Sequence, residues 1–326
     1  MQESLINGIR SLIYNGFGIE ATPFYESLTK TLGNFIFITI ELFILFIAIT
    51  AIIEYIMIHV NQKKLQKLFS GKGITGNIAG ALFGAITPFC ACSTIPMTVG
   101  FLNASLPFGS VMSFLISSPL LNPIIVAMLA ATVGVRNAII YFVLAFALSV
   151  IFGFLLEKLG FANHVKAVRV SGGKNLNMDG SDSRRELSVL KKILISLKAG
   201  WDTLRPILAY LFIGVAIGAA IYGYLPEGET IAKYAGEGNL FAVPLASIIG
   251  IPLYIRAETA IPIAMSLITK GVGMGTAIAL IIGGAGMAIP EMTMLAKIFR
   301  PKLLVSFIAV IFLVAVITGY AFNIIL

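Results

Sequence analysis

The sequence has little charge and few residues of the kinds that bind metals. Charged residues make up 12% of its 326 residues, and it contains two cysteines, two histidines and one tryptophan. Soluble domains carry about 25% charged residues, whereas the mean hydropathy here is +0.97. A soluble globular protein is therefore excluded. Apolar runs of about 20 residues recur without the alternation of a membrane barrel, which predicts an all-α polytopic membrane protein with about 8–10 membrane segments.

The motifs of common enzyme classes are also missing. The sequence has no nucleotide-binding loop, no Ser-His-Asp arrangement and no intramembrane metalloprotease motif. Without a Cys-X-X-Cys pair, and with only His59 and His164, a closed four-ligand zinc site is not expected. We therefore predict that the protein is not an enzyme and has no cofactor.

The distribution of basic residues predicts orientation and domain boundaries. The net charge is +8, but the basic residues lie in short segments between apolar runs, which indicates membrane topology and not nucleic-acid binding. The basic segments 61–72 and 158–198 are expected in the cytoplasm. Residues 158–198 form a linker between a first repeat, 1–157, which begins with an interfacial segment, and a second repeat, 199–326. No cleaved signal peptide is expected, and the predicted location is the cytoplasmic membrane.

The two halves resemble each other when the sequence is shifted by 166 residues, which pairs Gly84 with Gly250, Gly109 with Gly275 and Gly153 with Gly319. Equivalent loops carry opposite charge bias. The basic segment 61–72 pairs with an acidic one at 227–238, and the single Arg136 pairs with a triply basic segment. Under the positive-inside rule, these loops lie on opposite sides, so the repeats are predicted to be inverted.

Prolines divide several of the apolar segments. Proline lacks the backbone N–H and clashes with the preceding turn, so we expect helix breaks at Pro88, Pro96, Pro119, Pro123, Pro252, Pro262 and Pro290. The hairpins that begin after residues 107 and 273 either cross the membrane or re-enter it. A broken helix at membrane depth is tolerated only inside protein or beside a water-filled cavity, and therefore the substrate is expected at these breaks.

Both cysteines lie between Pro88 and Pro96. Cys90 and Cys92 offer sulfur, which soft ions such as trivalent arsenic, copper(I) or zinc prefer. Two side chains at i and i+2 point the same way only in extended or irregular backbone, which we expect the prolines to supply. The alternative is that both cysteines are small apolar residues for tight helix packing.

The equivalent positions in the second half hold Arg256 and Glu258. Charges inside a membrane are costly, so we expect this pair to bind an anionic group or to exchange protons, with Glu291 as a second coupling residue; a static ion pair is the alternative. The other polar candidates for substrate binding are Ser93, Thr94, Ser117, Ser118, Asn122 and Thr259. The serines and Asn122 could instead satisfy one another across helices.

The segment Pro88-Phe89-Cys90-Ala91-Cys92-Ser93-Thr94-Ile95-Pro96 resembles the YraQ and arsenical permease (ArsP) family of predicted permeases. The resemblance also rests on Ser117-Ser118-Pro119-Leu120-Leu121-Asn122-Pro123. It implies about eight transmembrane helices, export of trivalent organoarsenicals by the ArsP members, and motif cysteines at Cys90 and Cys92.

We expect a secondary permease that exports a small soft-ligand solute, foremost a trivalent arsenical, by alternating access. Alternatives are a permease for a small anion or sulfur compound, copper or zinc efflux, and a non-transporting membrane subunit. The expected partners are a small-molecule or metalloid substrate and the lipid bilayer, with no nucleic acid; a homo-oligomer is left open.

Overall fold

The computed structural model describes residues 73–87, 91–166, 241–253 and 272–325, together with single positions outside these ranges. In this part of the chain the regular structure consists of helices and one isolated antiparallel bridge. The predicted all-α class is therefore confirmed.

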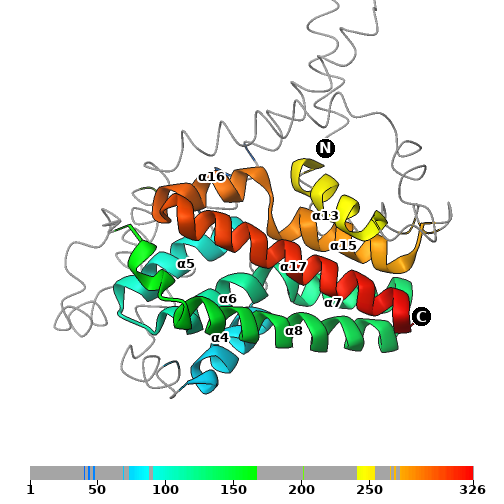
Figure 1. Cartoon of the computed structure of the whole chain (residues 1–326), viewed down its shortest axis with the longest axis horizontal. Helices are drawn as coiled ribbons and strands as arrows, with labels where there is room; N and C mark the ends of the chain where they lie inside the picture. The colour runs from blue at the N-terminus through cyan, green and yellow to red at the C-terminus, as the bar shows by residue number, and fades with distance from the viewer. Residues whose placement is uncertain are drawn as a thin grey trace, which may run out of the picture.

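The first half contributes five α-helices and a short 3-10 helix to the described residues (Figure 1). These are α4 (Ile74–Ile86), α5 (Ala91–Asn103), α6 (Phe108–Leu120), α7 (Pro123–Val133), α8 (Val135–Lys158) and η1 (Phe161–His164). The second half contributes α13 (Ala242–Leu253), α15 (Met274–Gly286), α16 (Ile289–Ile298) and α17 (Pro301–Ile325).

Two of these helices are long enough to cross a membrane unbroken. α8 has 24 residues and α17 has 25, and both are strongly apolar. At about 1.5 Å per residue, each exceeds the thickness of a hydrocarbon core of about 30 Å. Their outward faces carry large apolar side chains, such as Ile139 and Val143 of α8, each 57% exposed. Such faces fit lipid, and the chain is an integral membrane protein.

Each long helix is preceded by a pair of helices that meet at a bend, of 42° between α6 and α7 and of 49° between α15 and α16. α6 begins beside the end of α8, where Gly109 contacts Glu157, and α7 ends next to the start of α8. α15 begins beside the end of α17, where the Gly275 N–H donates to Asn323 Oδ1 at 3.0 Å. Each pair thus runs the length of its long helix, and the expected re-entrant hairpins are not confirmed.

The helix bounds of the two halves correspond. A shift of 166 residues carries the first residues of α6, α7 and α8 onto those of α15, α16 and α17. The contacts correspond as well: a Cβ on Gly84 would lie 3.0 Å from the Phe114 carbonyl oxygen, and one on Gly250 would lie 2.6 Å from that of Leu280. Leu280 is the residue 166 positions after Phe114. The same packing is therefore made twice.

The equivalent helices α8 and α17 run in opposite directions, side by side (Figure 1). The end of α8 is tied to the start of α17 by an antiparallel bridge between Val165 and Phe299. The Lys166 N–H donates to the Ile298 carbonyl oxygen at 2.8 Å, and the Arg300 N–H donates to that of His164 at 2.9 Å.

One of the expected helix breaks is wrong. Pro96 lies inside α5, and the helix continues through it to Asn103. Pro252 lies one residue before the end of α13 at Leu253, so a break close to it is not contradicted. Pro119 lies inside α6, one residue before the helix ends. A proline removes one helical hydrogen bond, and membrane helices tolerate this where neighbouring groups compensate for the freed carbonyl.

Other prolines do lie at breaks. Pro123 is at the first position of α7, and Pro290 lies within the first two positions of α16. An N–H at the start of a helix has no acceptor within the helix, so proline loses no hydrogen bond at these positions. The fixed φ of proline also suits a helix start. Pro88 and Pro262 are outside the described residues.

Candidate functional site

The two bends face each other in the middle of the molecule. Gly286 ends α15 and Leu120 ends α6, and a Cβ on Gly286 would lie 3.4 Å from Leu120 Cδ2. α5 packs against both α6 and α16. α5, the helix that carries Cys92, is therefore packed beside one element of each bent pair.

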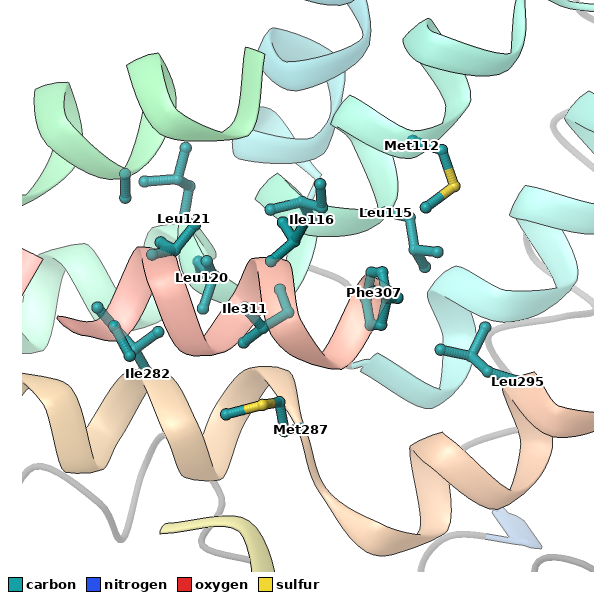
Figure 2. Close-up of a cluster of buried hydrophobic side chains, with 14 of the residues drawn as sticks. Met112, Leu115, Ile116, Leu120, Leu121, Ile282, Met287, Leu295, Phe307 and Ile311 are labelled. Atoms are coloured by element: carbon teal, nitrogen blue, oxygen red, sulfur yellow. The ribbon is translucent and has the colours of Figure 1, made fainter. Parts of the chain in front are cut away.

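The space between the bends is filled by apolar side chains. Figure 2 shows Leu120, Ile282, Met287 and Ile311 pointing toward one another from α6, α15, α17 and the residues after α15. Each of them is fully buried. This layer is closely packed and apolar, so polar contacts to a solute must come from its margins.

A pair of hydroxyls lies at one margin. Thr94 Oγ1 of α5 and Ser118 Oγ of α6 are 3.1 Å apart, and both residues are fully buried. The hydrogen bond joins two of the predicted substrate-binding residues across helices. Ser117 Oγ instead donates to the Phe114 carbonyl oxygen of its own helix at 3.2 Å and lies against Gly84 of α4.

The break between α6 and α7 is held by side chains. Asn122, another predicted substrate ligand, caps α7: its Oδ1 accepts from the Ile124 N–H at 3.0 Å. That N–H would otherwise bond the Leu120 carbonyl, which instead accepts from the Tyr141 hydroxyl of α8 at 2.8 Å. We did not predict Tyr141 as a site residue. A polar phenol in an otherwise apolar run was the signal that could have identified it.

The acidic coupling candidate Glu291 is in the first turn of α16, beside the second bend. Only 1% of its surface is exposed, so this carboxyl group lies within the protein and not against lipid. The positive end of a helix dipole stabilises a carboxylate at this position.

The sulfur segment differs from its predicted conformation. α5 begins at Ala91, so Ala91, Cys92 and Ser93 form its first turn and are not extended backbone. Pro96 does not prevent this because it is accommodated inside the helix. Cys90, Arg256, Glu258 and Thr259 lie outside the described residues. Within the described ranges no group of three or more His, Cys, Asp or Glu could hold a metal ion.

Long apolar helices, two bent pairs that meet in the interior and polar residues beside the bends are the architecture of a membrane transport protein. Comparison with known proteins agrees. Residues 27–324 match the ArsP_1 family, described as a predicted permease, and the chain belongs to this family.

Three relatives extend over most of the chain. The UPF0718 protein MJ0584 of Methanocaldococcus jannaschii is 24% identical over 322 residues, covering 82% of this chain and 87% of that protein. YcgR of Bacillus subtilis is 26% identical over 86% of this chain and 94% of its own length. A protein of Streptococcus mutans named a putative two-component membrane permease complex subunit is 23% identical, covering 90% of this chain and 94% of that protein. No solved structure matches the chain.

Proposed function

We propose that this permease is a secondary transporter that exports a small soft-ligand solute, foremost a trivalent organoarsenical, by alternating access. The observation that carries the proposal is the meeting of the two bends, Leu120 against Gly286, with α5, the helix that carries Cys92, packed against α6 and α16. Paired discontinuous helices that converge near the midplane are the recurring arrangement of substrate sites in secondary transporters.

The two halves act as inverted repeats in this proposal. The helix bounds that correspond after a shift of 166 residues, the repeated glycine contacts and the opposite directions of α8 and α17 support it. The domains are then 1–157 and 199–326, joined by the cytoplasmic linker 158–198. Rocking of one half against the other would expose the central site to each side of the membrane in turn.

In this mechanism Cys90 and Cys92 bind the arsenic through sulfur. Cys92 is in the first turn of α5, where backbone N–H groups favour an anion such as a thiolate. Arg256, Glu258 and Glu291 couple transport to protons or to a counter-anion, and the burial of Glu291 beside the second bend supports its part in this role.

The experiment is resistance of arsenic-sensitive cells to methylarsenite when they express the wild type or Cys90→Ser/Cys92→Ser. We expect the double variant to reach the membrane at wild-type levels but to give no protection. A matched control is Thr98→Val in α5, because the Thr98 hydroxyl bonds the Thr94 carbonyl of its own helix. Full protection by the double variant would refute cysteine-dependent arsenical export.

A second candidate is a permease subunit that works with a partner protein. The name of the Streptococcus mutans relative, a subunit of a two-component membrane permease complex, favours it. In that case the basic linker 158–198 is the docking segment, and the solute is a small anion held by Arg256 or a copper or zinc ion. Solute flux into liposomes that contain only the purified protein, retained after deletion of the linker, would exclude this candidate.

A further inference from the structure

A second polar cluster lies away from the bends, where α4, α6 and α8 meet. The space in which a Cβ of Gly109 would stand is taken by Glu157 Oε2 of α8 and by Asn77 Oδ1 of α4, the latter 2.8 Å from that point. One turn further along α6 the Ser113 hydroxyl contacts Gly153 of α8. Two glycines thus leave room for three oxygen-bearing side chains between the helices.

Two of these side chains, Asn77 and Ser113, have no hydrogen-bond partner among the described residues. Asn77 and Ser113 are fully buried, and neither the two polar atoms of the Asn77 amide nor Ser113 Oγ has a hydrogen-bond partner among the described residues. Buried polar groups without partners are rare, because burial removes their hydrogen bonds to water and no protein group compensates for the loss. Glu157 is exposed, so the cluster has a path to solvent past its carboxylate.

The equivalent helix contact of the second half is made without two of these three polar groups. At the positions 166 residues later stand Val243, Ala279 and Asn323, with Gly275 and Gly319 making the same helix contacts. There Val243 Cγ1 lies against Gly319, and Asn323 Oδ1 accepts from the Gly275 N–H. Apolar side chains therefore stand in place of Asn77 and Ser113, while Asn323 stands in place of Glu157, which points to a ligand as the reason for Asn77 and Ser113.

We propose that Asn77, Ser113 and Glu157 bind a small monovalent cation, Na⁺ or H₃O⁺. The donor atoms are an amide oxygen, a hydroxyl and a carboxylate, which are hard oxygen ligands. One carboxylate balances one positive charge, so a divalent ion would leave an uncompensated charge between apolar helices. The site is separate from the proposed solute site, and it gives the permease a place for a coupling ion.

The test uses the full-length protein in detergent and follows thermal unfolding in NaCl or in choline chloride at equal ionic strength. NaCl is expected to raise the Tm of the wild type in a saturable manner if Na⁺ binds. Asn77→Val and Ser113→Ala, which introduce the residues found in the second half, should lose this rise while remaining folded in choline chloride. Ser149→Ala is the control and should keep it, because the Ser149 hydroxyl already bonds the Ala145 carbonyl.

A second measurement, the pH dependence of Tm in choline chloride, distinguishes the two cations. Hydronium binding predicts a wild-type Tm that rises as the pH falls and a loss of that rise in both variants. A wild-type Tm that depends on neither Na⁺ nor pH, or variants that keep the wild-type dependence, would overturn the proposal. Equal destabilisation by Asn77→Val in every buffer would instead identify Asn77 as an interhelical hydrogen-bonding residue. The outcome is independent of methylarsenite resistance, so each proposal can fail alone.

Discussion

At the scale of single residues, the structure uses polar groups to hold broken backbone together in an apolar interior. Asn122 caps α7, Tyr141 bonds the last carbonyl of α6, and Thr94 bonds Ser118 across helices. A membrane interior supplies no water to these polar groups, so the protein itself has to provide each hydrogen bond. The polar groups at the α6–α7 bend therefore have defined hydrogen-bond partners within the protein.

Tyr141→Phe tests this at the α6–α7 bend. The Leu120 carbonyl would lose its hydroxyl partner, and its usual helical donor, the Ile124 N–H, is already bonded to Asn122. We expect the free energy of unfolding to fall by about 1–3 kcal/mol, the cost of an unsatisfied buried carbonyl. Reversible unfolding by SDS titration in mixed micelles measures it.

Ser306→Ala is the control for that change. The Ser306 hydroxyl is exposed and only adds a bond to the Lys302 carbonyl of its own helix, so we expect less than about 0.5 kcal/mol. Equal effects of both substitutions would show that Tyr141 does not hold the bend.

At the scale of helices, close approach of backbones replaces the hydrophobic effect as the source of packing energy. In membranes, small residues let helices approach, since lipid is as apolar as the protein. Gly84 and Gly250 do this at the α4–α6 and α13–α15 contacts. The two contacts are equivalent, so they should respond alike to the same substitution.

Gly84→Ala and Gly250→Ala are each expected to lower the free energy of unfolding by about 1–3 kcal/mol through overpacking. A Cβ would lie 3.0 Å from the Phe114 carbonyl oxygen in the first case and 2.6 Å from that of Leu280 in the second. Gly100→Ala in α5 is the matched control, because nothing lies within 4 Å of its Cβ position.

Alanine favours a helix over glycine by up to about 1 kcal/mol, so the control should be neutral or more stable. SDS unfolding of the three variants makes the comparison. If Gly84→Ala were as well tolerated as Gly100→Ala, the helices would not depend on this close contact.

At the scale of the whole molecule, the end of α8 and the start of α17 lie together, joined by the bridge between Val165 and Phe299. Lys158 and Lys302 are exposed near this end, and Arg136 is exposed near the opposite end of α8. The positive-inside rule favours the cytoplasm for the end with more basic residues.

Single cysteines placed at these positions test the arrangement. In a Cys90→Ser/Cys92→Ser background, Lys158→Cys and Lys302→Cys should react with a membrane-impermeant maleimide only from the cytoplasmic side. Arg136→Cys should react only from outside. Labelling of all three from one side would contradict the antiparallel crossing of α8 and α17.

Much of the element order could be predicted from the sequence. The apolar runs at 137–156 and 303–325 lie within the helices α8 and α17, and the bends fall close to Pro123 and Pro290, because a proline at a helix start is a strong local signal. The prediction failed at Pro96, where packing against neighbouring helices outweighs one lost hydrogen bond. Local rules cannot weigh that compensation.

Hydropathy and glycine spacing are properties of the chain, so the membrane class, the helical fold and the 166-residue correspondence could be read without coordinates. The folded arrangement was needed to show that the bends meet at Leu120 and Gly286, that Tyr141 bonds the end of α6, and that Asn77 shares a space with Glu157. These are contacts between segments far apart in sequence. They depend on helix directions and crossing positions, which no local pattern specifies.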